Sequence, residues 1–143
     1  MSKPVVAVVN DDTQFLRLME MVLASAGYET LIFFEGGTTF DEIRNHMPDV
    51  VVLDIRMEQP ESGWIILDLM RLDEATADIP VVVCSADHEQ LLSKEEYLAT
   101  KRAGVLRKPF DIDDLVEKVT EFVDAARSPQ ASTSATSPGG EGA

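Results

Sequence analysis

Five short apolar runs alternate with five longer stretches of helical periodicity, and this alternation limits the folds open to the chain more than any other feature. The apolar runs are Val5–Val9, Thr30–Phe34, Val50–Leu53, Ile79–Cys84 and Val105–Leu106. Three of them are almost wholly Val, Ile and Leu without polar alternation, which is typical of parallel strands covered on both faces. Strict alternation of strand and helix implies right-handed βαβ crossovers. We therefore predict an α/β fold with a doubly wound parallel sheet of five strands.

The stretches between these runs repeat apolar residues three and four positions apart, as amphipathic helices do. The clearest are residues 15–26, which Gly27 closes, residues 66–70 after Gly63, and residues 112–123 after Pro109. The stretches 40–47 and 91–98 show the same spacing more weakly. We predict one helix in each stretch, with Trp64 as a packing residue that opens the third.

The chain of 143 residues has the length of one domain. Its last sixteen residues, Ser128 to Ala143, contain only Ser, Thr, Pro, Gly, Ala, Gln and one Glu. Such a composition buries too little apolar surface to offset the entropy cost of ordering. We expect a folded unit over residues 1–127 and a disordered tail or linker over 128–143.

The net charge and the single cysteine limit the classes of function that are open to the chain. A net charge of −14 opposes contact with phosphate backbones, which are bound by clusters of Lys and Arg, so we expect no direct nucleic-acid binding. The single cysteine, Cys84, lies in an apolar run and is expected to be a buried, inert strand residue. No segment is long enough to insert into a membrane and no signal peptide is evident, so the expected location is the reducing cytoplasm.

Polar and charged residues close four of the five apolar runs. They are Asn10, Asp11 and Asp12 after the first, Asp54 after the third, Ser85 after the fourth, and Lys108 with Pro109 after the fifth. Ligands of open α/β sheets bind beyond the carboxyl ends of the strands, where the strand order reverses. In the order 2-1-3-4-5 the first, third, fourth and fifth strands are neighbours, so these side chains can converge.

Each of these residues also has a purely structural interpretation. Asp11 or Asp12 is a good N-cap for the following helix, Asp54 and Ser85 suit strand ends, and Lys108 suits solvent. The combination favours a site, because three packed carboxylates repel one another unless cations intervene.

The charges of the predicted site suggest which cations these are. Asp11, Asp12 and Asp54 carry −3 together, which one divalent ion and Lys108 neutralise. Oxygen ligands favour Mg²⁺, with Mn²⁺ as the alternative, over zinc. Such a pocket suits a phosphoryl group, and transfer of that group to Asp54 would give a reactive acyl phosphate.

With these motifs the chain resembles the receiver domains of two-component response regulators over residues 4 to 126. The matching motifs, in order, are Asn10-Asp11-Asp12, residues 51–57 around Asp54, residues 82–86 around Ser85, and Lys108-Pro109-Phe110. The resemblance implies a flavodoxin-like (βα)5 fold with strand order 2-1-3-4-5. It also implies a cis peptide bond between Lys108 and Pro109.

The resemblance also implies a role for each site residue. Asp54 would be the phosphoacceptor, and Ser85 and Lys108 would contact the phosphoryl group. The Mg²⁺ ligands would be Asp11, Asp12, Asp54 and the backbone carbonyl of Arg56. The phosphodonor would be a sensor histidine kinase or a histidine phosphotransfer protein, and a downstream protein target or output domain would read the result. The domain would catalyse only its own phosphorylation and dephosphorylation.

Two departures from the family pattern keep an alternative open. Val105 stands where the family usually has an aromatic residue, and the loop 57–63 is one residue longer than the common form. The alternative is a degenerate receiver that acts as a phosphorylation-independent interaction module or scaffold.

Other classes of protein fit the sequence less well. The sequence favours the receiver interpretation over a phosphohistidine at His46 or His88. It also favours it over a metal-dependent phosphatase that acts on small molecules. A flavodoxin-type FMN binder and a dehalogenase-type phosphatase fail at the loop after the first strand. The FMN binder needs a loop rich in Ser, Thr and Gly there, which this chain lacks. The phosphatase needs two aspartates separated by one residue, whereas Asp11 and Asp12 are adjacent.

Overall fold

The computed structural model describes residues 3–10, 12–34, 39–55, 60–85, 88–100 and 103–127, with five strands and six helices in these ranges. The strands are β1 (Val5–Val9), β2 (Glu29–Phe33), β3 (Val50–Ile55), β4 (Val81–Ser85) and β5 (Ala103–Arg107). The helices are α1 (Thr13–Ser25), α2 (Thr39–His46), α3 (Pro60–Leu72), α4 (His88–Ser93), α5 (Glu95–Thr100) and α6 (Ile112–Arg127).

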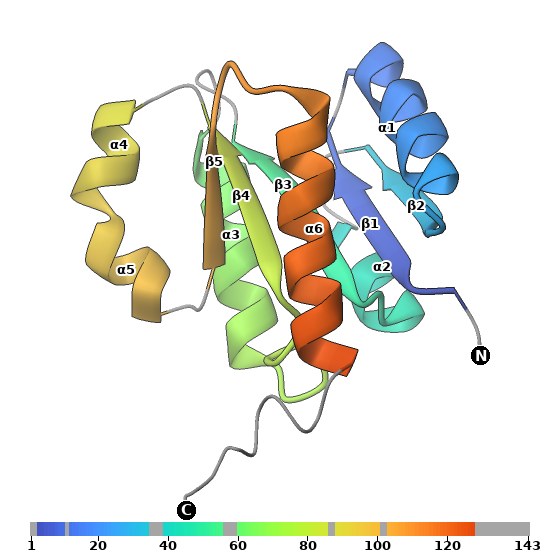
Figure 1. The fold of residues 1–143 in the computed structure, drawn as a ribbon. Helices are drawn as coiled ribbons and strands as arrows, with labels where there is room; N and C mark the ends of the chain where they lie inside the picture. Colours follow the sequence, from blue (N-terminus) through green and yellow to red (C-terminus); the bar gives the residue numbers. More distant parts are fainter. Residues whose placement is uncertain are drawn as a thin grey trace, which may run out of the picture.

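The five strands form one parallel sheet in the order β2-β1-β3-β4-β5, which confirms the predicted architecture (Figure 1). Every residue of β3 and β4 is buried. Strands covered on both faces need apolar side chains on both faces, which explains their runs of Val, Ile and Leu without alternation. The carboxyl ends of all five strands lie at the same edge of the sheet.

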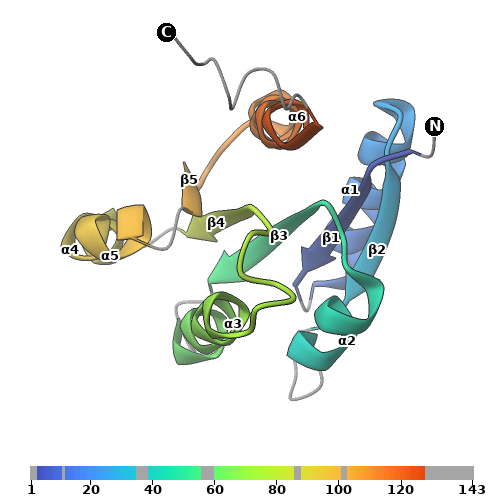
Figure 2. The same ribbon diagram turned by 90° about the horizontal axis from the view of Figure 1, so that it is seen from below.

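Helices cover both faces of the sheet and give the domain three layers (Figure 2). On one face α1 and α6 bury Leu16, Met19, Leu115 and Val119 against the strands. On the other face α2, α3, α4 and α5 supply a second core, whose helical members are Ile43, Trp64, Ile66, Leu67, Met70, Leu91 and Leu98. The packing role that we predicted for Trp64 is confirmed by its burial in this core.

The third predicted helix starts earlier than its apolar spacing indicated. It begins at Pro60, so Gly63 does not precede the helix and Trp64 does not open it, and both lie within its first turns. Proline suits the first helical position, where no intrahelical N–H is required. Glycine at position 63 lets the helix approach β3 closely, because a Cβ atom there would overlap Cδ1 of the Ile55 side chain.

The fourth predicted helix is two helices, α4 and α5, which are separated by a turn at Lys94. Leu91 and Leu98 are both buried and stand seven residues apart. A spacing of seven is also that of one face of a single continuous helix, so periodicity could not reveal the break. The Lys94 ammonium lies 5.0 Å from the centroid of the Trp64 ring, a cation–π contact that links this turn to α3.

β1 has the predicted boundaries, whereas at least one boundary of each of the other four strands moves by one or two residues. β4 begins at Val81 and not at Ile79, because Pro80 has no N–H to give to the ladder, although its carbonyl accepts a bond from Val51 N at 3.0 Å. β3 extends through Asp54 to Ile55, and β4 includes Ser85. Both polar residues therefore belong to the strands themselves.

Replacing Gly104 in β5 with alanine is expected to destabilise the domain. An added Cβ would lie 2.5 Å from Cζ and 2.8 Å from Cε2 of Phe122, whose ring packs on this strand from α6. Overpacking of this kind lowers the free energy of unfolding by about 1–3 kcal/mol. Alanine also restricts the unfolded chain more than glycine does, and this gain in stability offsets part of the loss. Urea unfolding followed by Trp64 fluorescence measures the loss. Adding Phe122→Leu should recover part of it, whereas a Gly104→Ala chain as stable as the wild type would contradict this packing.

Candidate functional site

The sheet register brings the predicted site residues to one edge. Asp54 of β3 pairs in register with Cys84 of β4, and Ile55 pairs with Ser85. Asn10 directly follows Val9, which pairs with Leu53, so Asn10 stands level with Asp54 on the neighbouring strand. This edge lies at the carboxyl ends of the strands, toward the top of Figure 1. It is the edge at which ligands of open α/β sheets bind.

The turn after β1 is held by the side chain of Asn10, which is buried. Its Oδ1 atom accepts a hydrogen bond from Asp12 N at 2.9 Å, and its own backbone N–H donates to Phe33 O at 3.1 Å. From the sequence, Asn10 was expected only to close the first apolar run. An asparagine at a strand end, two residues before another polar residue, is a known signal for such a turn and could have indicated it.

Asp12 is the N-cap of α1, as its structural interpretation predicted. Its Oδ1 atom accepts hydrogen bonds from Gln14 N at 3.0 Å and Phe15 N at 3.2 Å. Both cap bonds use the same carboxylate oxygen. The second oxygen, Oδ2, takes no part in the cap, so the capping role leaves an oxygen that can bind a cation.

Asp54 and Lys108 form an ion pair between Oδ1 and Nζ. Asp54 is only 7% exposed, and in the described part of the chain Oδ1 accepts no hydrogen bond beyond this ion pair. The backbone of Lys108 is tied to β4, because its N–H donates to Ser85 O at 2.9 Å. The Lys108–Pro109 peptide bond is cis, as the family resemblance implied. The structure thus brings together Asp54 of β3, Ser85 of β4 and Lys108, which directly follows β5.

Cys84 lies next to this site and is buried. Burial, with a smaller effect of the Asp54 carboxylate, raises the pKa of the Cys84 thiol to about 12, and the Lys108 charge opposes the shift. Since the thiolate is the reactive form, we expect the native chain to resist thiol reagents at neutral pH and the urea-unfolded chain to react fully. A chromogenic disulfide reagent measures both rates. Fast labelling of the native chain would contradict a buried, protonated thiol.

The described residues fit a divalent cation in the chemistry of their donors. Asp12 and Asp54 offer carboxylate oxygens, the ligands that Mg²⁺ prefers, and the buried Oδ1 of Asp54 accepts no hydrogen bond from the described residues. Among these residues, no group of three or more His, Cys, Asp or Glu side chains is arranged to hold a metal. Asp11 and Arg56, the other two predicted ligands, lie outside the described residues.

Other residues singled out from the sequence have less to do with the site. Val105, at the position that is usually aromatic, is half-buried and packs against the core shared by α2, α3, α4 and α5. His46 ends α2, where Nδ1 contacts Glu42 O at 2.9 Å. Of the loop 57–63, residues 57–59 lie outside the described residues.

Comparison with known proteins identifies the family. The response regulator receiver domain family matches residues 6–120, and the chain belongs to this family. Phosphorylation-dependent switching is typical of its members. Among the helices that the structure describes, none is both long enough and apolar enough to cross a membrane.

Curated relatives are transcriptional regulators of greater length. The chain is 30% identical over 138 residues to the transcriptional regulatory protein PrrA of Mycobacterium bovis, with 94% of the chain and 56% of the relative covered. It is 30% identical over 123 residues to the transcriptional regulator NtrC of Escherichia coli, with 86% and 25% covered. The chain therefore spans about half or less of these relatives.

Solved structures of receiver domains share the fold. The receiver domain of the Francisella response regulator 1452 aligns with a TM-score of 0.75 at 26% identity, covering 87% of this chain and all of that one. The receiver domain of NtrC in its apo form aligns with a TM-score of 0.74 at 29% identity, covering 87% and 98%. Both alignments span nearly the whole solved domain.

Proposed function

We propose that the domain is a phosphorylation-dependent switch that accepts a phosphoryl group on Asp54 in a Mg²⁺-dependent reaction. The observation that carries this proposal is the buried Asp54 carboxylate, whose Oδ1 is paired with Lys108 at the carboxyl edge of the sheet. A buried carboxylate is costly, and its position beside the Lys108 ammonium favours a chemical role. Membership of the receiver family supports the same role.

The proposed transfer uses few groups of this chain. A carboxylate oxygen of Asp54 attacks phosphorus, and the bond between phosphorus and the imidazole nitrogen of the donor breaks. The imidazole keeps the electron pair and takes up a proton from solvent. Lys108 neutralises negative charge on the transferring group, as preorganised cations do in phosphoryl transfer. Dephosphorylation is attack by water on the same phosphorus, which releases inorganic phosphate and restores the carboxylate.

The metal ligands in this proposal are Asp11, Asp12, Asp54 and the Arg56 carbonyl. When bound there, Mg²⁺ would supply positive charge to the phosphoryl oxygens. Asn10 would contribute by fixing the backbone of Asp12, and Asp12 would bind through the oxygen that is not used in the N-cap. Mn²⁺ prefers the same kind of oxygen ligands and is the alternative ion.

The switch itself would run through β4 and β5. Phosphorylation of Asp54 places new anionic oxygens next to Ser85 and Lys108, whose backbones are already joined by a hydrogen bond. Drawing both side chains toward the phosphoryl group would favour one of two conformations that exist beforehand. The surface formed by the fourth and fifth βα units, which are β4 with α4 and α5, and β5 with α6, would change with them.

We propose that partners act at both ends of this reaction. The donor would be a sensor histidine kinase or a histidine phosphotransfer protein in the cytoplasm, and a protein target or an attached output domain would read the phosphorylated state. PrrA and NtrC, which are transcriptional regulators, support such an output. The domain would cover residues 1–127, with 128–143 as a disordered tail or linker, and would not itself touch nucleic acid.

Metal dependence tests the proposal. Incubation of the chain with acetyl phosphate and Mg²⁺ should add the mass of one phosphoryl group, and EDTA should prevent the gain, because the clustered carboxylates repel the donor without the cation. Intact-mass spectrometry measures both. No gain from acetyl phosphate or from a phosphorylated histidine donor would contradict the switch and favour the phosphorylation-independent scaffold.

A further inference from the structure

The outer face of α3 carries a stripe of exposed apolar side chains. Ile65 is 55% exposed, Leu69 is 40% exposed and Leu72 is 79% exposed. With about 100° per residue, the three positions fall within an arc of about 60° and extend about 10 Å along the helix. Single exposed leucines are ordinary, whereas three in one stripe are typical of a contact surface. We call Ile65, Leu69 and Leu72 the α3 stripe.

The fold of the domain does not require the α3 stripe. The opposite face of the same helix buries Leu67 and Met70 completely against the sheet. In Figure 2, α3 lies on one side of the sheet, with α2 on one flank and α4 and α5 on the other. No helix or strand that the structure describes covers its outer side. The stripe is therefore available to another molecule at no loss to the core.

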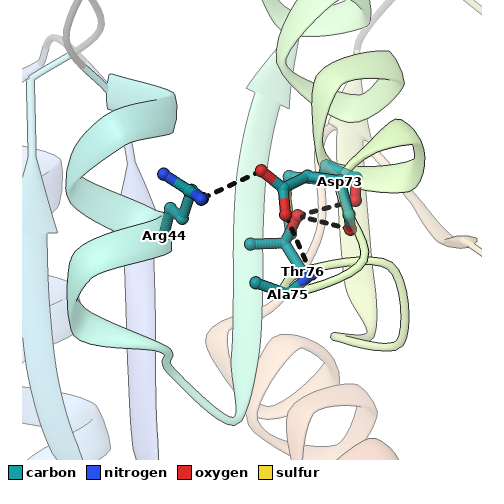
Figure 3. A network of polar contacts seen from close by, with 5 residues as sticks. Arg44, Asp73, Ala75 and Thr76 are labelled. Carbon is teal, nitrogen blue, oxygen red and sulfur yellow. Dashed lines mark hydrogen bonds and ion pairs between the residues drawn. The ribbon is translucent and has the colours of Figure 1, made fainter.

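Polar contacts hold the carboxyl end of α3 and the following turn in place. Arg44 Nε of α2 pairs with Asp73 Oδ2 at 2.9 Å, and Asp73 Oδ1 accepts a hydrogen bond from Ala75 N at 2.8 Å (Figure 3). Thr76 Oγ1 donates to Met70 O at 2.6 Å, which is a buried contact. A fixed surface loses little freedom when it binds, so more of the contact free energy appears as affinity.

The surroundings of the α3 stripe are acidic. Residues 60–79 contain five acidic side chains, Glu61, Asp68, Asp73, Glu74 and Asp78, and one basic side chain, Arg71. Arg71 points its Nη1 atom at the carbonyls of Ala77 and Ile79, at 3.1 and 2.8 Å. The nearest cation of α2, Arg44, is paired with Asp73. The Lys94 ammonium, which lies over the Trp64 ring of α3, adds a third cation to Arg71 and Arg44. Carboxylates still outnumber these cations and the whole chain carries −14, so the face combines apolar contact area with negative charge.

This combination selects the kind of partner. A second copy of the chain would bring two bodies of charge −14 together at their acidic faces, which is electrostatically unfavourable. An amphipathic helix with apolar side chains at positions i, i+4 and i+7 and Lys or Arg beside them matches both the stripe and its charge. We propose that the α3 stripe is a docking surface for a basic amphipathic helix of another protein. This proposal does not depend on phosphorylation of Asp54.

A synthetic helix tests the docking surface directly. The probe is a helical peptide of about 16 residues with leucines at the i, i+4, i+7 spacing and lysines on both flanks. Its affinity for the chain is measured by titration, and its position is mapped by amide chemical shifts of the isotopically labelled chain. We expect the shifts to centre on α3. A peptide with glutamate in place of every lysine should bind at least about tenfold more weakly.

Two lysine variants separate docking from general attraction between opposite charges. Leu72→Lys places a charge in the stripe, whereas Met21→Lys makes the same charge change on α1 at a side chain that is 68% exposed. We expect Leu72→Lys to raise the dissociation constant at least about tenfold and Met21→Lys to change it less than about twofold. Both positions are exposed, so thermal unfolding should confirm that both variants fold.

Several results would overturn the proposal. Equal weakening by the two lysine variants would mean that the peptide binds through net charge alone, and shifts centred away from α3 would locate it elsewhere. Absence of peptide binding would also refute it. Sedimentation that shows self-association of the wild-type chain, lost in Leu72→Lys, would assign the stripe to a second copy instead.

Discussion

Replacing Asp54 with asparagine is expected to abolish metal-dependent uptake of the phosphoryl group. The amide oxygen carries no full negative charge and attacks phosphorus poorly, while its shape preserves the packing of a side chain that is buried in β3. The same change removes one of the proposed metal ligands and the partner of Lys108. Intact mass after incubation with acetyl phosphate and Mg²⁺ reports the loss as the absence of a phosphorylated species.

The matched control for this variant is Asp124→Asn. Asp124 lies on α6 and is exposed, so the control removes the same charge away from the site. It should take up phosphate at the rate of the wild-type chain. Continued uptake by Asp54→Asn would move the acceptor to another residue and contradict the proposed chemistry.

Replacing Lys108 with methionine is expected to slow phosphoryl uptake by about 10²-fold, the usual effect of losing one preorganised charge from a transition state. Methionine keeps the apolar stem of the side chain and removes the ammonium that pairs with Asp54. The change leaves a buried carboxylate without this counter-ion, so some loss of stability should accompany the slower reaction. The rate is measured from the time course of intact mass.

Two companion variants separate the role of Lys108 from the overall loss of positive charge. Arg107→Met removes a cation from the preceding, exposed position of β5 and should change the rate little. Lys108→Arg retains the charge with a different shape and should restore part of the rate. A rate for Lys108→Met close to that of the wild type would show that the ion pair has no catalytic role.

Much of the fold could be predicted because strands that are buried on both faces of the sheet need consecutive apolar residues, which are easily seen in the sequence. The core residues of β1, β3 and β4 must be apolar on consecutive positions, so polar residues collect where those strands meet solvent. Asp54 is an instructive case, because the prediction placed it just beyond the strand. It lies within the strand, where its carboxylate is buried beside the ammonium of Lys108.

The features that sequence reasoning missed depend on contacts between distant segments. The break between α4 and α5 leaves Leu91 and Leu98 on one face, and the Lys94 contact with Trp64 joins residues thirty positions apart. The close packing of the first turns of α3 on β3 uses the space that Gly63 leaves for the Ile55 side chain. The positioning of Asp12 by Asn10 is local, and its turn signal was present in the sequence.

The most direct test of the central claim locates the phosphoryl group itself. An acyl phosphate on aspartate is reduced by borohydride to the alcohol, which converts the residue into homoserine at the modified position. After phosphorylation, reduction and digestion, peptide mass spectrometry should find homoserine at position 54 and no reduced side chain at any other aspartate or glutamate. Homoserine at a different position, or none in a chain that had gained the phosphoryl mass, would contradict Asp54 as the phosphoacceptor.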